Sequence, residues 1–347
     1  MKINAIISVS GFGYCGTTAV VDILRSFSKE IDITEDIEYQ ILYFPDGISD
    51  LDYKLNVSFN RYYDCDVAIT RFLDYCEKYE FFYPSSFHGK LRDLAEEYID
   101  SLISMSWTSL WTYDRLNTPH ESVLRYRRYI QRIDKWNSRA HFVNRILRKF
   151  GIPKISIKAN RECYKKRRIY MSVCPDGFIE KTHLFLSATL EELASKQNAK
   201  YTLLRQFLPP GFPSRYYKYL PYPVKTIVVS RDPRDLYVLA KQKDVLFIPH
   251  DNVENFIIWY RENFKAECME NNPDVLRLQF EDLIFDYDNQ VRIICEYLNL
   301  DVEQVTKKWF NPDKSSANTR MFLSEKKLES DIQVIEQKLP EYLYQFK

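Results

Sequence analysis

Residues 3–18, INAIISVSGFGYCGTT, decide how the chain begins. The apolar run 3–9 is typical of a buried strand, and residues 17–27, TTAVVDILRSF, carry apolar side chains at helical spacing. Three glycines lie between them. Glycine lets the backbone fold back so that successive N–H groups converge on an anion, and the dipole of the following helix adds partial positive charge. The stretch predicts a strand, a turn that binds a phosphate or phosphosulfate, and a helix, although a turn that needs glycine only for packing has the same pattern.

The whole sequence has the composition of an ordinary globular protein. Of its 347 residues 45% are hydrophobic and 28% are charged, and its 8 Gly and 15 Pro are too few for a collagen-like or low-complexity chain. The length is sufficient for one large α/β domain. The 49 basic and 48 acidic residues nearly cancel, which argues against a uniformly charged binder of nucleic acid or membranes.

Seven cysteines are scattered through the chain without a C-x-x-C pair, which fits neither a disulfide framework nor a zinc site. They indicate a reducing compartment. The first apolar run is too short for a signal peptide, and no run of 18 apolar residues follows it. We therefore expect a cytoplasmic protein with no membrane anchor.

The same patterns predict further elements. Residues 201–208 and 225–230 are β-branched runs suited to a buried parallel sheet, and residues 278–300 predict a strand edge followed by an amphipathic helix. A mostly helical insertion is expected at about residues 68–150.

A hairpin is predicted around the turn signal Pro175-Asp176-Gly177. Its strands would be RIYMSV at 168–173 and FIEKTHLFL at 178–186. Ser187 is then expected to cap a short helix after the second strand.

A second candidate binding element is Arg231-Asp232-Pro233-Arg234-Asp235, directly after the strand 225–230. Ligands of open parallel sheets bind beyond the carboxyl ends of the strands. An arginine at that place can hold a phosphate through a bidentate fork. The same residues also suit the start of a helix, with Asp232 as its cap and Pro233 at its first position.

In order and spacing, the glycine turn and this RDPRD element resemble the sulfotransferases that use 3′-phosphoadenylyl sulfate (PAPS). In that family a G-x-x-x-x-G-T-T loop holds the 5′-phosphosulfate, and the arginine that opens R-D-P-[RK]-D holds the 3′-phosphate. The resemblance implies an α/β, P-loop-like three-layer fold with a central parallel sheet, as a single domain over residues 1–347. It also implies that PAPS is bound by Arg231 and by the loop residues Gly11, Phe12, Gly13, Tyr14, Cys15, Gly16, Thr17 and Thr18.

The end of the chain resembles the family too. Residues 280–283 (FEDL) with 295–298 (CEYL) are similar to its Y-E-D-L…F-L element. Residues 311–318 (NPDKSSAN) are similar to a late loop that covers the nucleotide in bacterial members, which implies cofactor contacts for Lys314 and Asn318.

Two positions depart from the family pattern. Family loops usually carry Lys or Arg where this chain has Tyr14, and Leu239 stands near the place of a serine that usually helps to hold the 3′-phosphate. The candidates for a compensating cation are Lys181, Lys158, Lys241 and Lys314.

Residues 178–184, FIEKTHL, are the candidates for acid–base chemistry. In cytosolic sulfotransferases a K-T-H segment supplies a lysine that neutralises the leaving phosphate and a histidine that deprotonates the acceptor, whereas heparan-type enzymes use the glutamate of an E-K-[ST] segment as the base. On a strand, Lys181 and His183 would share one face and Glu180 would lie on the other. We therefore predict His183 as the base with Lys181 beside it, and Glu180 as the alternative base.

Positive charge is concentrated in residues 125–168. The segment has 16 basic and 2 acidic residues, a net charge of +14, so the rest of the chain carries −13. With its interleaved aromatic residues it suits an acceptor that is an anionic glycan. A solvated helix face that pairs with the acidic remainder has the same composition, and so has a nucleic-acid-binding segment.

Together these features predict an enzyme that moves a sulfuryl group from PAPS to a hydroxyl of an acceptor, with a carbohydrate (polysaccharide or glycolipid) as the expected acceptor. We expect no metal requirement, because cations and backbone N–H groups can absorb the charge of the transfer, and no stable nucleic-acid partner. One alternative is a nucleotide-dependent kinase with a P-loop, although Thr17 stands where its lysine would be. The other is a non-catalytic binder of nucleotides or nucleic acid that retains the fold.

Overall fold

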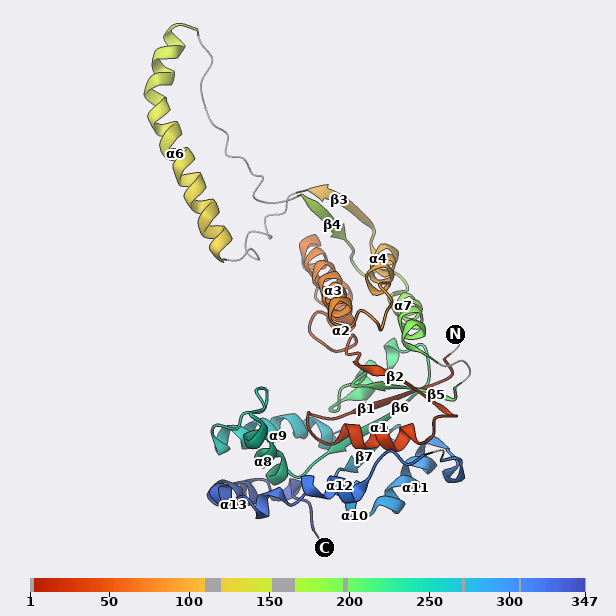
Figure 1. The fold of residues 1–347 in the computed structure, drawn as a ribbon. Helices are drawn as coiled ribbons and strands as arrows, with labels where there is room; N and C mark the ends of the chain where they lie inside the picture. The colour runs from red at the N-terminus through yellow and green to blue at the C-terminus, as the bar shows by residue number, and fades with distance from the viewer. Residues whose placement is uncertain are drawn as a thin grey trace.

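The computed structural model describes residues 3–109, 120–151, 166–195, 199–269, 272–305 and 307–346. A five-stranded sheet in the order β2-β5-β1-β6-β7 forms its centre (Figure 1). Every neighbouring pair in this sheet is parallel. The strands are β1 (Ile6–Ser10), β2 (Ile31–Glu38), β5 (Tyr201–Arg205), β6 (Val224–Ser230) and β7 (Val275–Gln279). The predicted α/β fold with a central parallel sheet is confirmed.

Helices cover both faces of the sheet. On one face, Ile7 and Val9 of β1 pack with buried residues of α1 (Thr17–Arg25) and α11 (Tyr287–Leu298). On the other, Ile6 belongs to a separate cluster with α3 (Tyr62–Phe82), α4 (Leu91–Leu102) and α7 (Phe178–Leu193). A third cluster joins α8, α9 and α13. Because successive side chains of a strand point to opposite faces, β1 contributes to two of these clusters, and the molecule has three layers. The helices of these layers that follow β6 are α8 (Pro233–Lys243), α9 (Val253–Met269), α10 (Asp282–Phe285), α11 (Tyr287–Leu298), α12 (Pro312–Ser315) and α13 (Glu329–Lys338), and α1 (Thr17–Arg25) follows β1.

Between β2 and β5 the chain leaves the sheet. It forms α2 (Ile48–Asp52), a π-helical turn (Tyr53–Val57), α3 (Tyr62–Phe82) and α4 (Leu91–Leu102), and after them α6 (His120–Lys149) and α7 (Phe178–Leu193). β3 (Met105–Ser109) interrupts the segment that we expected to be mostly helical, and it pairs antiparallel with β4 (Arg167–Met171). This two-stranded sheet lies between the main body and α6 (Figure 1). Among the described residues, no helix is long and apolar enough to cross a bilayer.

The predicted hairpin at 168–186 is wrong. Residues 178–186 begin the helix α7, and β4 pairs with β3 instead. Gly177 precedes the helix in the left-handed conformation, with φ 66°, and the buried residues of α7 recur at helical spacing, at Phe178, Thr182, Phe185, Leu186, Thr189, Leu190 and Leu193. This spacing buries one stripe of the helix against the cluster around α3 and α4, and Ser187 lies within the helix rather than at its start.

An ion pair with a buried carboxylate fixes β4 to α3. Asp66 is fully buried and accepts hydrogen bonds from both terminal nitrogens of Arg167, at 3.0 and 2.6 Å, and from the backbone N–H of Tyr170 at 3.0 Å. The neighbouring Arg168 pairs with Asp100 at 2.6 Å, but both of those side chains are about half exposed. The two pairs therefore differ in burial more than in geometry.

We expect Asp66→Ala to lower the free energy of unfolding by about 3 kcal/mol, because it removes a buried carboxylate that pairs with the partly buried Arg167 and accepts from the N–H of Tyr170. The matched variant Asp100→Ala should cost less than about 1 kcal/mol, since water screens an exposed pair. Urea unfolding followed by circular dichroism measures both values. Equal losses in the two variants would contradict the role assigned to Asp66.

Candidate functional site

The glycine turn adopts a conformation that requires glycine. β1 ends at Ser10 and α1 begins at Thr17, and between them Gly13 and Gly16 have φ 93° and 94°. A Cβ on Gly16 would collide with the ring of Phe280, and one on Gly13 would lie 2.7 Å from Cε2 of Phe247. Gly16 therefore has no room for a side chain, and at both positions the positive φ favours glycine.

This loop forms one wall of a cleft of about 770 Å³. The cleft lies beyond the carboxyl ends of β2, β5, β1 and β6, where ligands of open parallel sheets bind. Residues at each of these four strand ends line the cleft. Residues of the segments that follow β2 and β5 also contribute to it. Its lining residues are Gly11, Phe12, Gly13, Tyr14, Gly16, Thr17, Thr18, Glu38, Gln40, Tyr43, Arg205, Gln206, Pro210, Arg231, Lys243, Phe247, Phe280 and Asn318.

Most of the predicted cofactor contacts lie in this cleft, and two do not. Cys15 is buried behind the loop in the cluster of α8 and α9, where its thiol donates to the carbonyl oxygen of Gly13 at 3.3 Å. Lys314 is not among the lining residues, whereas Asn318 is. Both belong to residues 311–322, which we call the late segment. The cleft thus brings together seven loop residues, Arg231 and Asn318.

Arg231 connects the loop to the late segment. Its side chain donates to the carbonyl oxygen of Tyr14 at 3.1 Å and to that of Asn318, and its Nε is buried with no hydrogen-bond partner among the described residues. Only 3% of Arg231 is exposed, and this burial lowers the pKa of its guanidinium. A buried cation with an unused donor at the wall of a cleft suits an anionic ligand group.

The rest of the RDPRD element builds the helix start that the sequence also allowed. Asp232 caps α8 by accepting from the N–H of Arg234 at 2.8 Å, with Pro233 at the first position. Arg234 pairs with Asp232 at 2.7 Å. Asp235 accepts from the N–H groups of Arg320 and Phe322, at 2.8 and 3.3 Å, and so holds the late segment in place. Arg231 therefore lines the cleft, and the other residues of the motif build the start of α8 and hold the late segment next to Arg231.

Three charged residues of the cleft were not predicted. Lys243, at the end of α8, places its ammonium 5.7 Å from the ring centroid of Tyr14. Glu38, at the end of β2, lies 3.9 Å from Arg205, at the end of β5. Burial raises the pKa of Glu38 and lowers that of Arg205. The sequence predicts the strand at 201–208, which contains Arg205, but it does not predict β2, which contains Glu38.

The predicted catalytic residues lie elsewhere. Glu180, Lys181 and His183 are in the first two turns of α7, and no residue of α7 is among the lining residues of the cleft in the described chain. His183 Nε2 lies 3.0 Å from the carbonyl oxygen of Lys218. Because these residues form a helix, Glu180 and His183 are one turn apart, and the prediction that they occupy opposite faces of a strand is wrong.

The proposed compensating cations are also outside the cleft lining. Lys241 points to Asp331, 4.0 Å away, and Lys158 falls outside the described residues. Lys181 and Lys314 do not line the cleft. Within the described ranges, no group of three or more His, Cys, Asp or Glu side chains is placed to hold a metal ion, and the absence of a metal requirement stays a prediction.

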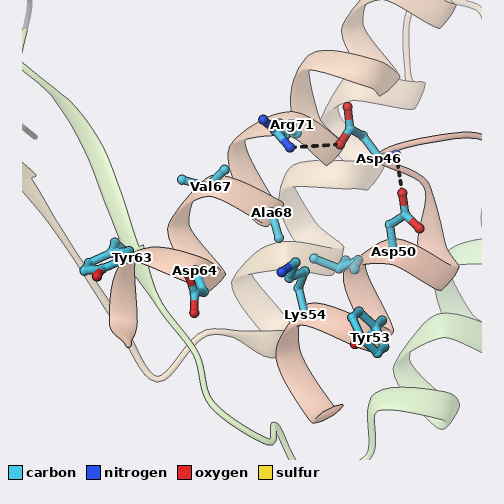
Figure 2. A pocket seen from close by; sticks show the side chains of 10 residues that line it. Asp46, Asp50, Tyr53, Lys54, Tyr63, Asp64, Val67, Ala68 and Arg71 are labelled. Carbon is cyan, nitrogen blue, oxygen red and sulfur yellow. Dashed lines mark hydrogen bonds and ion pairs between the residues drawn. The ribbon is translucent and has the colours of Figure 1, made fainter. Parts of the chain in front are cut away.

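A second cavity, of about 390 Å³, lies between α2 and α3 (Figure 2). Its acidic residues already have partners in the local structure. Asp46 pairs with Arg71 at 3.7 Å, Asp50 accepts from the N–H of Asp46 at 2.8 Å, and Asp64 accepts from the N–H of Asn60 at 2.9 Å. These contacts explain the charged side chains of this cavity as supports for the turn before α2 and the start of α3.

No protein-family model and no curated protein matches the chain. Similar solved structures include the sulfotransferase domain of the Synechococcus olefin synthase (11% identity, 100% of this chain and 97% of that chain covered, TM-score 0.39). They also include the sulfotransferase domain of the curacin biosynthetic pathway (11%, 99% and 100%, 0.36) and retinol dehydratase in complex with androsterone and the inactive cofactor PAP (13%, 92% and 68%, 0.32). Each of these superpositions has a TM-score below 0.5.

Glu281, at the start of α10, is a buried carboxyl that makes the stability of the fold depend on pH. It is fully buried, and its Oε1 accepts from the N–H of Asp232 at 3.0 Å. Burial raises the pKa of its carboxyl from 4.5 to about 7. A carboxyl whose pKa is higher in the folded state stabilises the fold below its unfolded pKa, and this contribution is lost as the pH rises through the folded value.

We therefore expect the wild-type protein to lose up to about 3 kcal/mol of stability from this group as the pH rises from 4.5 to about 7. Glu281→Gln keeps an acceptor for Asp232 and cannot ionise, so its loss over the same range should be smaller. Urea unfolding across this range measures the difference. Glu296→Gln, at an exposed position of α11, is the control and should follow the wild type; an unchanged slope in the Glu281 variant would refute the assignment.

Proposed function

We propose that the chain is a PAPS-dependent sulfotransferase that transfers a sulfuryl group to a hydroxyl of a carbohydrate acceptor. The observation that carries the proposal is the meeting of the glycine loop and Arg231 in one cleft, joined by the hydrogen bond from Arg231 to the carbonyl oxygen of Tyr14. The two elements are far apart in the sequence, and both are suited to phosphate groups. The cleft volume of about 770 Å³ is in the range of nucleotide and cofactor sites.

Different residues of the cleft would bind different groups of PAPS. The N–H groups of the loop from Gly11 to Thr18 would hold the 5′-phosphosulfate at the start of α1, and Arg231 would hold the 3′-phosphate with its unused Nε–H. Lys243 supplies positive charge beside Tyr14, where the family pattern has a cation in the loop itself. PAPS, when bound, supplies the sulfuryl group that is transferred.

Glu38 is our proposed general base. Its carboxylate lines the same cleft as the loop, and burial raises its pKa, which makes it a stronger proton acceptor than a solvated carboxylate. Arg205, 3.9 Å away, would orient the carboxylate. Tyr79 donates to the backbone carbonyl oxygen of Glu38 and so fixes the end of β2. His183 in α7 remains the alternative base, as the K-T-H spacing predicts.

The acceptor side of the cleft combines aromatic faces with amide groups. Tyr14 and Phe247 stack with their ring centroids 5.9 Å apart and are both exposed, and Gln40 lines the same cleft, as does Gln206, whose amide is bonded to the backbone of Gly11. Apolar faces with a few polar groups suit a sugar ring and its hydroxyls. The described part of the basic segment 125–168 does not line the cleft, so it does not contribute to this proposal.

The donor assignment predicts that adenosine 3′,5′-bisphosphate stabilises the protein without added metal. A ligand that binds only the folded state should raise the melting temperature by roughly 5 °C at a hundredfold excess over its Kd. Lys243→Ala should weaken this binding about tenfold, because it removes an opposite charge from the site. Lys241→Ala, on the same helix but outside the cleft, is the matched control.

Arg231→Lys should abolish most of the shift as well, since lysine keeps the charge and loses the fork. Stronger stabilisation by ATP with Mg²⁺ would favour the kinase alternative. Stabilisation by single-stranded RNA alone would favour the non-catalytic binder.

The base assignment predicts that Glu38→Gln lowers kcat by ~10²-fold or more while nucleotide binding is retained. His183→Ala should leave most of the activity. Both are measured as transfer of labelled sulfuryl from PAPS in a screen of carbohydrate acceptors. An inactive His183 variant beside an active Glu38 variant would reverse the assignment.

A further inference from the structure

Helix α6 is exposed and stands clear of the rest of the described chain. It runs from His120 to Lys149, about 45 Å at 1.5 Å per residue. Figure 1 shows it beyond the β3–β4 pair, away from the central sheet. Two large apolar side chains near its end, Phe142 and Phe150, are 68% and 75% exposed. A helix of this length with apolar side chains in water has a face that suits a partner.

The apolar side chains form a broad arc over the last turns of the helix. At 100° per residue they cover about 160° of its circumference. A narrow stripe at spacings of three and four residues runs through the arc, and two further residues widen it on one side. The stripe consists of Trp136, Ala140, Val143, Leu147 and Phe150, and the two residues beside it are Phe142 and Ile146.

The same turns are basic. From Lys135 to Phe150 the sequence contains five Lys or Arg and no Asp or Glu. On the helical projection Lys135 and Arg139 lie within the arc, on the side of Phe142 and Ile146. Lys149 lies next to one edge and Arg148 beyond the other, and these four side chains are exposed. Long basic side chains can lay their stems along an apolar surface while their charged ends stay in a polar layer.

We propose that α6 binds the surface of a membrane that contains anionic lipids, with the arc at the boundary between headgroups and acyl chains. Trp, Phe and Leu side chains with Lys and Arg among and beside them are the composition of helices that lie in this interface, because the long basic side chains can reach the headgroups. Each basic residue near an anionic leaflet adds to the attraction. The binding does not depend on the chemistry of the cleft.

A second copy of the chain fits this helix less well. A two-stranded coiled coil buries a narrow seam, and Phe142 and Ile146 would remain outside it. The positions that flank the seam carry Arg132 and Arg139, with no acidic residue to pair with them across two copies. A polyanionic glycan or nucleic acid would satisfy the charges but would leave the apolar arc in water.

The rest of the molecule also fits a membrane surface. With +14 in residues 125–168, the remainder carries −13. An anionic surface attracts the helix and repels the body, so the body, with its cleft, would be held on the water side of the helix.

The test is flotation of the intact protein with lipid vesicles. We expect it to float with vesicles of phosphatidylcholine and phosphatidylglycerol and not with phosphatidylcholine alone, and we expect salt to weaken the binding. Val143→Ser with Phe150→Ser should weaken it at least about tenfold. Leu184→Ser with Ile258→Ser, at exposed positions of α7 and α9, is the matched control and should bind as the wild type does.

The charged side of the helix is tested separately. Arg145→Gln with Arg148→Gln and Lys149→Gln should weaken the binding about tenfold or more and reduce its dependence on salt. The proposal is overturned if the wild type does not bind anionic vesicles, or if the serine variant binds as well as the control. It is also overturned if sedimentation shows a dimer that the serine variant loses, or if the wild type binds heparin and no vesicles.

Discussion

The cleft is organised by a guanidinium that has been removed from water. Arg231 is buried at the end of β6, and desolvation of a cation is costly unless opposite charges and acceptors surround it. Asp235 and Glu281 lie close enough to favour its charge, and the carbonyl oxygens of Tyr14 and Asn318 accept from its side chain. These contacts come from the glycine loop, α8, the end of β7 and the late segment, so the position of one charge fixes four parts of the chain.

This arrangement leaves the Nε–H of the guanidinium without a hydrogen-bond partner among the described residues. Asp232 and Asp235, which could neutralise Arg231 by direct pairing, are occupied: Asp232 by the start of α8 and by Arg234, Asp235 by two N–H groups of the late segment. Glu281 has a raised pKa and is therefore a weaker counter-ion near neutral pH. An anionic group in the cleft would complete the neutralisation, so the proposed site can be stable and still attract phosphate.

The sequence predicts the elements in which local pattern and tertiary environment agree. The strand, glycine turn and helix of residues 3–27 require only short-range signals, and parallel pairing then places Arg231 beside the loop. The segment 178–186 contains β-branched and aromatic residues that suit a strand, yet its burial follows the helical period because α3 and α4 cover it. β2, IDITEDIE, is an edge strand in which three Ile are interspersed with acidic residues, so it has no continuous apolar run, and Glu38 at its end could not be found without the sheet order.

The position of Lys243 shows how a departure in a motif can be balanced by another element. Tyr14 has φ 52°, in the left-handed region, and its ring lies over the cleft against Phe247. A cation at the end of α8 reaches the face of this ring, so charge comes from a neighbouring helix while the loop residue contributes an aromatic surface. Because Lys243 is exposed at a helix end and not fixed in the loop backbone, its charge is placed by a flexible side chain. In the proposed site, the loop backbone and Arg231 would set the geometry of anion binding, and Lys243 would set mainly the electrostatic potential.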